Sequence, residues 1–411
     1  MGKRLEKSII LGLMITALGT NVASADSIIF HSDGGVHNYT TITNNLVGEY
    51  VNIYAANGST INVSGNANLT TDYSTLGHQE FGALVQNSGS TINFFGTNNT
   101  ITTTATGIDG AVSGLVTNQG TINFGGGTIN NTATNTTNHN RGVNVQTSGS
   151  VININGATNI NMVTTGTGSK ETEGVFAGSG TVANINANLN VDVKAGTGTI
   201  MALGPSSGTV NINNGVTNLT VESATANRIM GVGMGEGSTV LNTAAGTTLN
   251  INMNGTPTTQ YGILGQGGST ITANGAVNIH LNGTAVNNGN NNIGVYSNRN
   301  STQIFNGDVS IDSVNQSIGI RMAGGTSEYN GNLTVYGTNN DMAVGSTAGS
   351  VRINKNQNKT VKLDGRVSSL SNGTGITEIH LSDSASYIHG DIINSNSAGL
   401  THHEQELPYP L

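Results

Sequence analysis

Short runs of alternating apolar and polar residues follow one another along most of the chain. In the run that begins at Gly89, Ile92 and Phe94 fall on one face of an extended strand and Asn93 falls on the other. Alternation with a period of two is typical of a half-buried β-strand. The runs are separated by Gly, Asn and Ser, which favour tight turns. The pattern therefore predicts many short strands joined by turns.

One of these runs recurs at a nearly constant interval. Gly-Ser-Thr-Ile-Asn, or a close variant of it, begins at Gly58, Gly89, Gly120, Gly149, Gly180, Gly208, Gly237 and Gly268. Weaker copies begin near Ser301, Thr326 and Gly349. Consecutive starts of the clear copies lie roughly 30 residues apart, and a fixed period of this length indicates a repeat architecture in which each copy is one structural unit.

Each repeat holds three apolar runs. A run such as Gly114-Leu115-Val116 precedes the Thr-Ile-Asn run, and a third, such as the one containing Val277 and Ile279, follows it. One such turn cannot bury its apolar face alone, whereas stacked turns build a continuous core. We therefore predict an all-β, single-stranded parallel β-helix (a β-solenoid) with three short strands per rung and about ten rungs. Outward Asn and Thr at repeated positions are expected to stack as side-chain ladders.

Two other all-β architectures compete with this prediction. A propeller has longer, four-stranded blades, often with aromatic signatures, and neither feature is present. A stack of antiparallel hairpins needs regular two-residue turns. Asn57-Gly58 is such a turn, but turns of this kind do not recur regularly. The solenoid is favoured over both.

The chain divides into four segments by pattern. Residues 1–25 read as a secretory signal peptide, because a basic start is followed by a short apolar run and the small residues Ala23-Ser24-Ala25. Residues 26–50 lack the motif and are assigned to an N-terminal cap, which the exposed end of a solenoid requires. Residues 51–390 form the β-helix repeats. Residues 391–411 are a non-repeat tail.

Composition and charge exclude several classes of protein. Charged residues make up 9 % and aromatics 4 %, whereas hydrophobic residues reach 35 % and Gly reaches 59 copies, a profile unlike that of a disordered chain. The net charge is −8, and it becomes −10 once the three basic residues and one acidic residue of the signal are removed. Without basic clusters to neutralise phosphates, no nucleic-acid partner is expected. Cys is absent, so no disulfide framework is possible.

The signal peptide, the Gly-Ser-Thr-Ile-Asn rungs and the Gly-Val or Gly-Ile strand before each of them resemble autotransporter passenger domains of Gram-negative bacteria. The resemblance covers roughly residues 51–390. It implies a non-enzymatic rod that is displayed at the cell surface or outer membrane, or secreted, and acts in adhesion or self-association. Its partners would be host or bacterial cell surfaces, or like chains. The family's C-terminal translocator barrel is missing from this chain. We therefore expect a truncated fragment, which would remain periplasmic, rather than a chain whose barrel is encoded separately.

Few residues are candidates for catalysis, and we expect that none of them is catalytic. The Gly-Asp-Ser-Gly string of the family's protease members is absent. The alternative function is a secreted carbohydrate-active β-helix enzyme, a polysaccharide lyase or hydrolase, which needs paired carboxylates. Asp308 and Asp312 share a strand face by spacing, and His389-Gly390-Asp391 loosely suggests a second such site.

No cofactor and no metal site is expected either. The nine His are dispersed, and the adjacent pair His402-His403 offers fewer ligands than the four of a structural zinc site. Gly125-Gly126-Gly127 lacks the Asp of calcium-binding solenoid repeats. No Lys-Ser or Lys-Thr follows the Gly-rich string at Gly231, so no phosphate loop is predicted.

Overall fold

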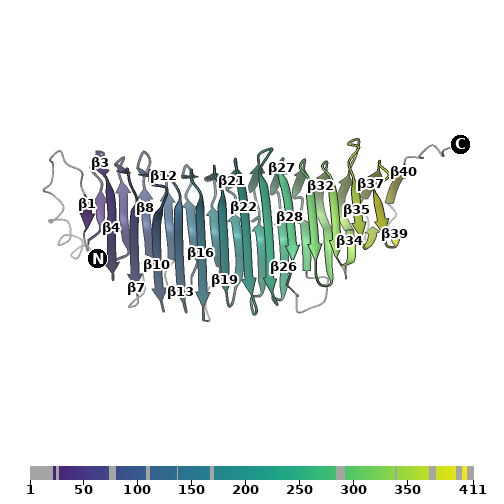
Figure 1. The fold of residues 1–411 in the computed structure, drawn as a ribbon, viewed down its shortest axis with the longest axis horizontal. Helices are drawn as coiled ribbons and strands as arrows, with labels where there is room; N and C mark the ends of the chain where they lie inside the picture. The colour runs from purple at the N-terminus through teal and green to yellow at the C-terminus, as the bar shows by residue number, and fades with distance from the viewer. Residues whose placement is uncertain are drawn as a thin grey trace.

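The chain winds into a straight rod of stacked turns (Figure 1). The computed structural model describes residues 22–24, 27–73, 80–107, 112–136, 138–166, 171–283, 292–337, 340–369, 376–394 and 400–404. The described part is a parallel β-solenoid of about 11 turns with three strands per rung in two sheets, which confirms the predicted fold class and its predicted rung number of about ten. Of the predicted signal peptide, residues 1–21 and 25 lie outside the described residues.

Within the described residues, sheet A has 14 strands, which follow one another along the rod. Its strands are β1 (Val22–Ser24), β4 (Thr41–Val47), β7 (Ala67–Tyr73), β10 (Asn99–Thr106), β13 (Gly127–Thr134), β16 (Thr158–Thr165), β19 (Leu189–Ala195), β22 (Val216–Ser223), β25 (Thr248–Gly255), β28 (Ala276–Leu281), β31 (Val309–Ser313), β33 (Leu333–Gly337), β35 (Val361–Asp364) and β38 (Tyr387–His389). Each inner strand pairs in parallel with the strands of the turns before and after it.

Sheet B has 26 strands in the described part of the chain, and most turns contribute two of them. The first in each turn is β2 (Ile29–His31), β5 (Val51–Ala56), β8 (Glu80–Gln86), β11 (Val112–Asn118), β14 (Asn140–Gln146), β17 (Glu171–Ala177), β20 (Thr199–Pro205), β23 (Arg228–Gly233), β26 (Thr259–Gly265), β29 (Asn292–Asn298), β32 (Ser317–Tyr329), β34 (Asn340–Ile353), β36 (Arg366–Ser369) or β39 (Ile392–Asn394). The second, which carries the Thr-Ile-Asn run, is β3 (Val36–Tyr39), β6 (Thr60–Val63), β9 (Thr91–Phe94), β12 (Thr121–Phe124), β15 (Val151–Ile154), β18 (Val182–Ile185), β21 (Thr209–Ile212), β24 (Val240–Thr243), β27 (Thr270–Ala273), β30 (Thr302–Phe305), β37 (Ile376–Leu381) or β40 (Leu400–Glu404).

Two turns near the C-terminus differ from the others. In β32 and in β34, the two sheet B strands of a turn merge into a single strand that bends through Gly residues. β32 accordingly pairs with both β29 and β30. The repeat is also short here, since the register partners Gln303 and Ser327 are 24 residues apart, and the same separation recurs one turn later. The corner itself is one residue shorter, because Asn298 and Thr302, on either side of it in the preceding turn, pair with Ala323 and Thr326.

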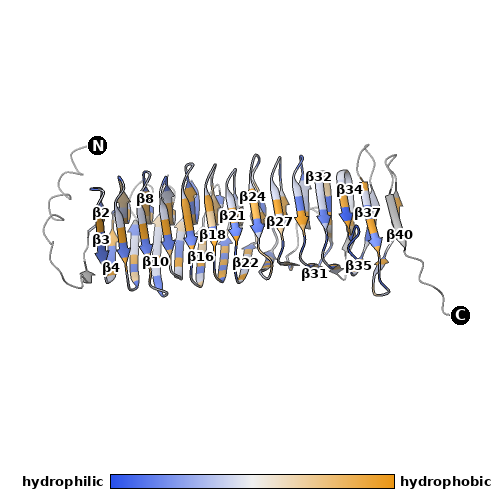
Figure 2. Cartoon of the chain, turned by 90° about the horizontal axis from the view of Figure 1, so that it is seen from above, coloured by the Kyte–Doolittle hydropathy of each residue, from blue (hydrophilic) through white to orange (hydrophobic). Residues whose placement is uncertain are grey.

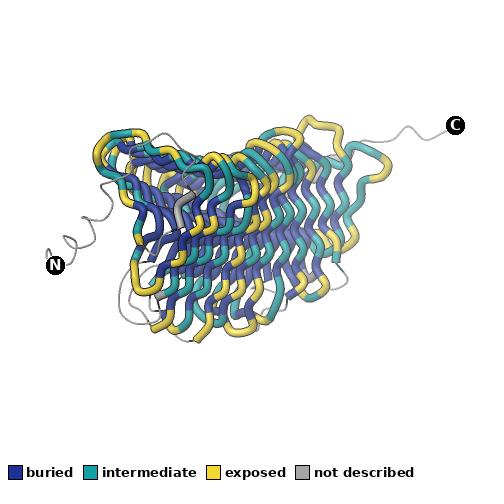
Figure 3. Tube along the Cα trace, turned by 60° about the vertical axis from the view of Figure 1, so that its left-hand side comes forward, coloured by how far each residue is buried: buried dark blue, intermediate teal, exposed yellow. Residues whose placement is uncertain are grey.

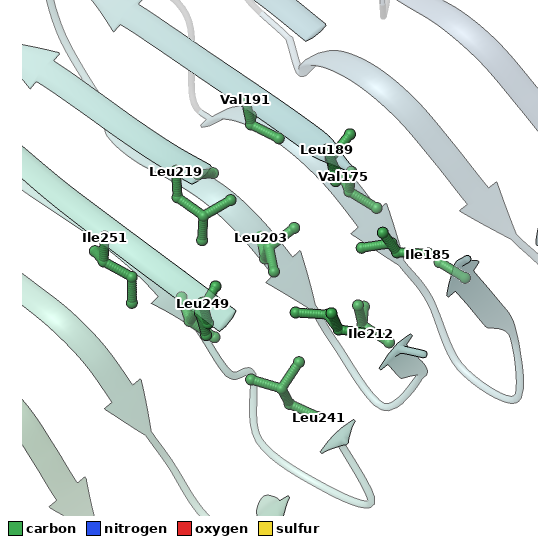
Figure 4. Packing of buried hydrophobic residues seen from close by; sticks show 14 of the residues in the cluster. Val175, Ile185, Leu189, Val191, Leu203, Ile212, Leu219, Leu241, Leu249 and Ile251 are labelled. Carbon is green, nitrogen blue, oxygen red and sulfur yellow. The ribbon is translucent and has the colours of Figure 1, made fainter. Parts of the chain in front are cut away.

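The core lies between the two sheets and runs the length of the rod. In sheet A and in the Thr-Ile-Asn strands alternate residues point inward, so the burial pattern of the Thr-Ile-Asn strands alternates between intermediate and buried. Identical or similar side chains stack from turn to turn, as Ile92, Ile122 and Ile152 do. Figure 4 shows this stacking for Leu, Ile and Val side chains of β17 to β25, and Figures 2 and 3 show the alternation of hydropathy and of burial along the strands.

The strand register shows that two glycines taken from the sequence as repeat starts do not occupy the same turn position as the others. Thr121 pairs with Thr91, so Gly120 lies opposite Ser90 rather than opposite the turn residue Gly89. The left-handed backbone conformation of that turn, φ = +81° at Gly89, is taken up by Gln119 with φ = +66°. Gly208 is displaced by one residue in the same way. Glycine is the usual residue for this conformation but not the only one that adopts it.

The first described turn of sheet B carries unusual residues at its inward positions. β2 and β3 pair with β5 and β6 in the same register as later turns. His31 and His37 occupy the positions that Ala55 and Ile61 take one turn later. Polar rings therefore lie over the N-terminal end of the aliphatic core.

Candidate functional site

A column of asparagine side chains follows the outward face of the Thr-Ile-Asn strands. Its members are Asn38, Asn62, Asn93, Asn123, Asn153, Asn184, Asn211 and Asn242. From Asn62 onward, each Nδ2 donates a hydrogen bond to the Oδ1 of the preceding member at 2.7 to 2.9 Å, and the seven bonds form an unbroken chain. We call this column the asparagine ladder. It confirms the predicted stacking of outward Asn.

The geometry of the ladder follows from the parallel register. Neighbouring strands lie about 4.8 Å apart, so equivalent residues of successive turns repeat at this distance. An amide side chain has two N–H donors and an oxygen with two lone pairs. The ladder uses one donor and one lone pair of each inner Asn. One N–H and one lone pair per turn remain available on the outward side.

Shorter ladders of the same kind flank this column. On sheet A, Asn190, Asn218, Asn250 and Asn278 continue a series that starts at Asn159, with bonds of 2.7 to 2.9 Å. At the end of the Thr-Ile-Asn strands, a second series joins Asn155, Asn186 and Asn213 at 2.8 Å. Rows of amide groups therefore cover two outward faces of the rod.

Towards the C-terminus, the same outward column changes its chemistry. After Thr272 and Ile304, it continues as Glu328, Arg352 and Glu378. The Arg352 guanidinium lies 3.2 Å from Glu328 Oε1 and 3.6 Å from Glu378 Oε2.

Glu378 makes two further contacts beside this column. Lys355 Nζ and His380 Nε2 lie 3.3 and 3.0 Å from its carboxylate oxygens. The hydrogen bond from His380, followed by that from Lys355, holds the pKa of Glu378 below its ordinary value against the opposing effect of burial. We call Glu328, Arg352 and Glu378 the charged ladder.

A buried ion pair lies on the outward side of the first sheet B strands. Arg141 in β14 and Glu173 in β17 are register partners, and Arg141 Nε donates to Glu173 Oε2. Their side chains are only 8 % and 2 % exposed. The Arg141 guanidinium also lies 3.5 Å above the centre of the Phe176 ring. Burial, more than any neighbouring charge, raises the pKa of Glu173 to about 7.

Histidine and aspartate gather at the N-terminal end of the rod. His37 Nε2 lies 2.9 Å from Asp33 Oδ1, and the His31 and His37 rings stack with their centres 3.5 Å apart. His31 Nε2 is 2.7 Å from the Tyr39 hydroxyl. The hydrogen bond with His37 is the main cause that holds the pKa of Asp33 well below its usual range, and burial lowers the pKa of His31 to about 4.

The carboxylates considered for sugar cleavage do not form a pair. Asp308 precedes β31 and accepts hydrogen bonds from Asn332, whereas Asp312 lies four residues further on, about 13 Å along an extended strand. Asp312 is held by His280 Nδ1 at 2.7 Å. Asp391 lies three turns away, beside β38, where His389 contacts Asp364 at 3.0 Å. The separation of Asp308 from Asp312 exceeds the spacing that either type of glycosidase requires.

The remaining sequence-based expectations on site residues stay predictions. His402 and His403 lie in β40, which pairs with β37. The absence of a cofactor also stays a prediction.

Reasoning from the sequence missed the ion pair of Arg141 and Glu173, although a signal was present. Both residues directly precede the Gly of the first apolar run in successive repeats, so opposite charges stood at equivalent repeat positions.

The class of protein that this geometry defines is a parallel β-solenoid with laddered outward faces. No protein-family model, curated protein or solved structure matches the chain. Among the described residues, no helix has the length and apolar character needed to cross a membrane.

Proposed function

We propose that the chain is a surface-exposed or secreted passenger rod of the autotransporter type that acts without catalysis, in adhesion or self-association. One observation carries the proposal, namely the asparagine ladder that runs across the turns from β3 to β24. Its unused donors and acceptors form an array with one amide per turn. Such an array offers many weak, identical contacts in place of one deep pocket.

A second copy of the same rod is the partner that the array fits best. Two rods laid side by side would present amides at the same spacing of about 4.8 Å, so contacts could form at many turns at once. Each contact is weak, but simultaneous contacts raise the overall strength of binding through effective concentration. The outward N–H and oxygen are complementary to themselves, because one amide can donate to another and accept from it.

The test places charge beside the ladder without breaking it. Thr91, Val151 and Thr209 lie on the outward face of the ladder strands and are half-buried. Replacing all three by Lys should make facing rods repel one another. The matched control places three Lys on the outward face of sheet A, where the side chains are also half-buried, at Thr70, Thr102 and Thr334, outside the turns that carry the asparagine series from Asn159 to Asn278.

The measurement is the clustering of beads coated with the purified rod, together with sedimentation of the free chain. We expect the unmodified chain and the sheet A control to cluster, and the Thr91, Val151 and Thr209 variant to stay dispersed. Equal loss of clustering in both Lys variants would refute a role for the ladder face. If the unmodified rods remain dispersed at every concentration, self-association is excluded and only adhesion to a different surface is left.

A further inference from the structure

The N-terminal end of the rod brings together three side chains that bind transition metals. One ligand atom each from His31, Asp33 and His37 lie within 4.8 Å of one another. Two imidazole nitrogens and one carboxylate oxygen suit Zn²⁺ and related first-row ions, whereas Ca²⁺ and Mg²⁺ prefer oxygen ligands alone. We propose that His31, Asp33 and His37 bind a divalent first-row transition ion, of which Zn²⁺ is the representative.

The fold positions these residues on both sides of one corner. His31 ends β2, Asp33 lies in the following turn, and His37 lies in β3. His31 and His37 stand at inward positions, so their rings cover the end of the core. A bound ion would connect β2 to β3 at this end.

Further hydrogen bonds already orient the three residues. Asp33 Oδ1 accepts hydrogen bonds from the Gly35 N–H at 2.9 Å and from Ser59 Oγ at 3.2 Å, which leaves Oδ2 for an ion. The Tyr39 hydroxyl contacts one nitrogen of His31. Partners of this kind orient the ligands of metal sites and raise their affinity. Ser59 belongs to the next turn, so it ties the site to the body of the rod.

Binding requires one defined rearrangement. The two imidazole rings are nearly parallel, with 11° between their planes. An ion lies close to the plane of each imidazole that binds it, so one ring must turn out of the stack. The ion would also replace the contact between His37 Nε2 and Asp33 Oδ1. A tetrahedral site of three protein ligands and one water is the expected product.

The experiment titrates the purified full chain with ZnCl₂ by calorimetry and with CoCl₂ by visible absorption. The background carries His402→Ala and His403→Ala, so that this pair contributes no ligands. We expect one equivalent of Zn²⁺, and a tetrahedral Co²⁺ spectrum that Zn²⁺ displaces. Asp33→Asn and His37→Gln should each weaken binding by about tenfold or more, and Ser59→Ala, a positioning change, by about tenfold. CaCl₂ should give no binding at this site.

The control is Asp312→Asn, which disturbs another close His–Asp contact, that of His280, and should leave Zn²⁺ binding unchanged. Hydrogen exchange gives a second readout, since Zn²⁺ should slow exchange of the β2 and β3 amides but not those of β12. The proposal is overturned if the chain binds no Zn²⁺, or if Asp33→Asn and His37→Gln bind it as the parent chain does. Asp33 is exposed, so its substitution by Asn leaves the packing of the core intact.

Discussion

The asparagine ladder and the charged ladder occupy the same outward column at opposite ends of the rod. From Asn38 to Asn242, one residue type repeats and bonds to itself. From Glu328 to Glu378, the residues alternate in charge. An amide both donates and accepts, so identical copies can stack without limit. A carboxylate only accepts, so a charged column must alternate its signs.

This difference shows that a parallel solenoid restricts which side chains can share a column. Stacking places equivalent residues about 4.8 Å apart, so each side chain meets its own counterpart. Asn side chains can hydrogen-bond to identical neighbours at every turn. Charged side chains form favourable contacts only where acidic and basic residues alternate from turn to turn. The two ends should therefore respond differently to mutation, pH and salt.

The largest expected effect concerns the buried pair of Arg141 and Glu173, whose charged groups have little access to water. At a pH well above the Glu173 pKa of about 7, where the carboxylate is ionised, Arg141→Met leaves this charge buried without its cation and should cost about 3–5 kcal/mol. The measurement is the local free energy of opening of β14 and β17, obtained from hydrogen exchange. The double variant Arg141→Met, Glu173→Gln should lose much less, because no charge is left unpaired. Equal losses in the single and double variants would mean that packing against Phe176, not charge, holds this site together.

The effect of Arg141→Met should also depend on pH. Burial raises the pKa of Glu173 in the folded chain to about 7, above its unfolded value. A raised pKa means that the folded state prefers the protonated acid, so this contribution to stability is present at low pH and is lost as pH rises through 7. Without Arg141 the pKa rises further. The defect should therefore be larger at pH 8 than at pH 5.

Intermediate effects on stability are expected in the asparagine ladder, and they should reveal which Asn of each pair donates the hydrogen bond. Asn123 donates to Asn93 and accepts from Asn153. Asn123→Asp removes the donor and places two oxygens face to face, at a cost of about 1–3 kcal/mol. Asn38 only accepts within the ladder, so Asn38→Asp keeps its bond from Asn62 and should be nearly neutral. Thermal unfolding of both variants is the measurement, and similar losses in the two would contradict the assigned direction.

The smallest effect is expected in the charged ladder. The pKa of Glu378 is lowered, chiefly by its hydrogen bond with His380, so its contribution is present above the ordinary Glu pKa and is lost as pH falls through the folded value. Acidification from pH 7 to about 3 should lower the local free energy of opening of β34 and β37, measured by amide hydrogen exchange, by about 1 kcal/mol or less. The same quantity should stay unchanged for β12 and β15. About 1 M salt should act in the same direction. Equal losses in both regions would remove the distinction between the two ladders.

The fold could be predicted because its signals are local and repeated. The alternation of Ile92, Asn93 and Phe94 defines two faces of a strand, and its recurrence about every 30 residues defines a turn. The candidate sites were harder to predict, because their members come from different turns. Arg141 and Glu173 are separated by 32 residues in the sequence. Residues this far apart can be identified as contact partners only when the pairing register of the strands is known.

What the sequence determined by itself was therefore the solenoid class, the three strands of a turn, and which residues face outward. Tertiary structure decided the contacts between turns. The length of each turn varies by several residues, and a single residue shifts a column, as the position of Gly120 opposite Ser90 shows. The meeting of His31, Asp33 and His37 also depends on how the first corner bends. Local alternation is encoded by adjacent residues, whereas register is the sum of all turn lengths and is settled only when the sheets form.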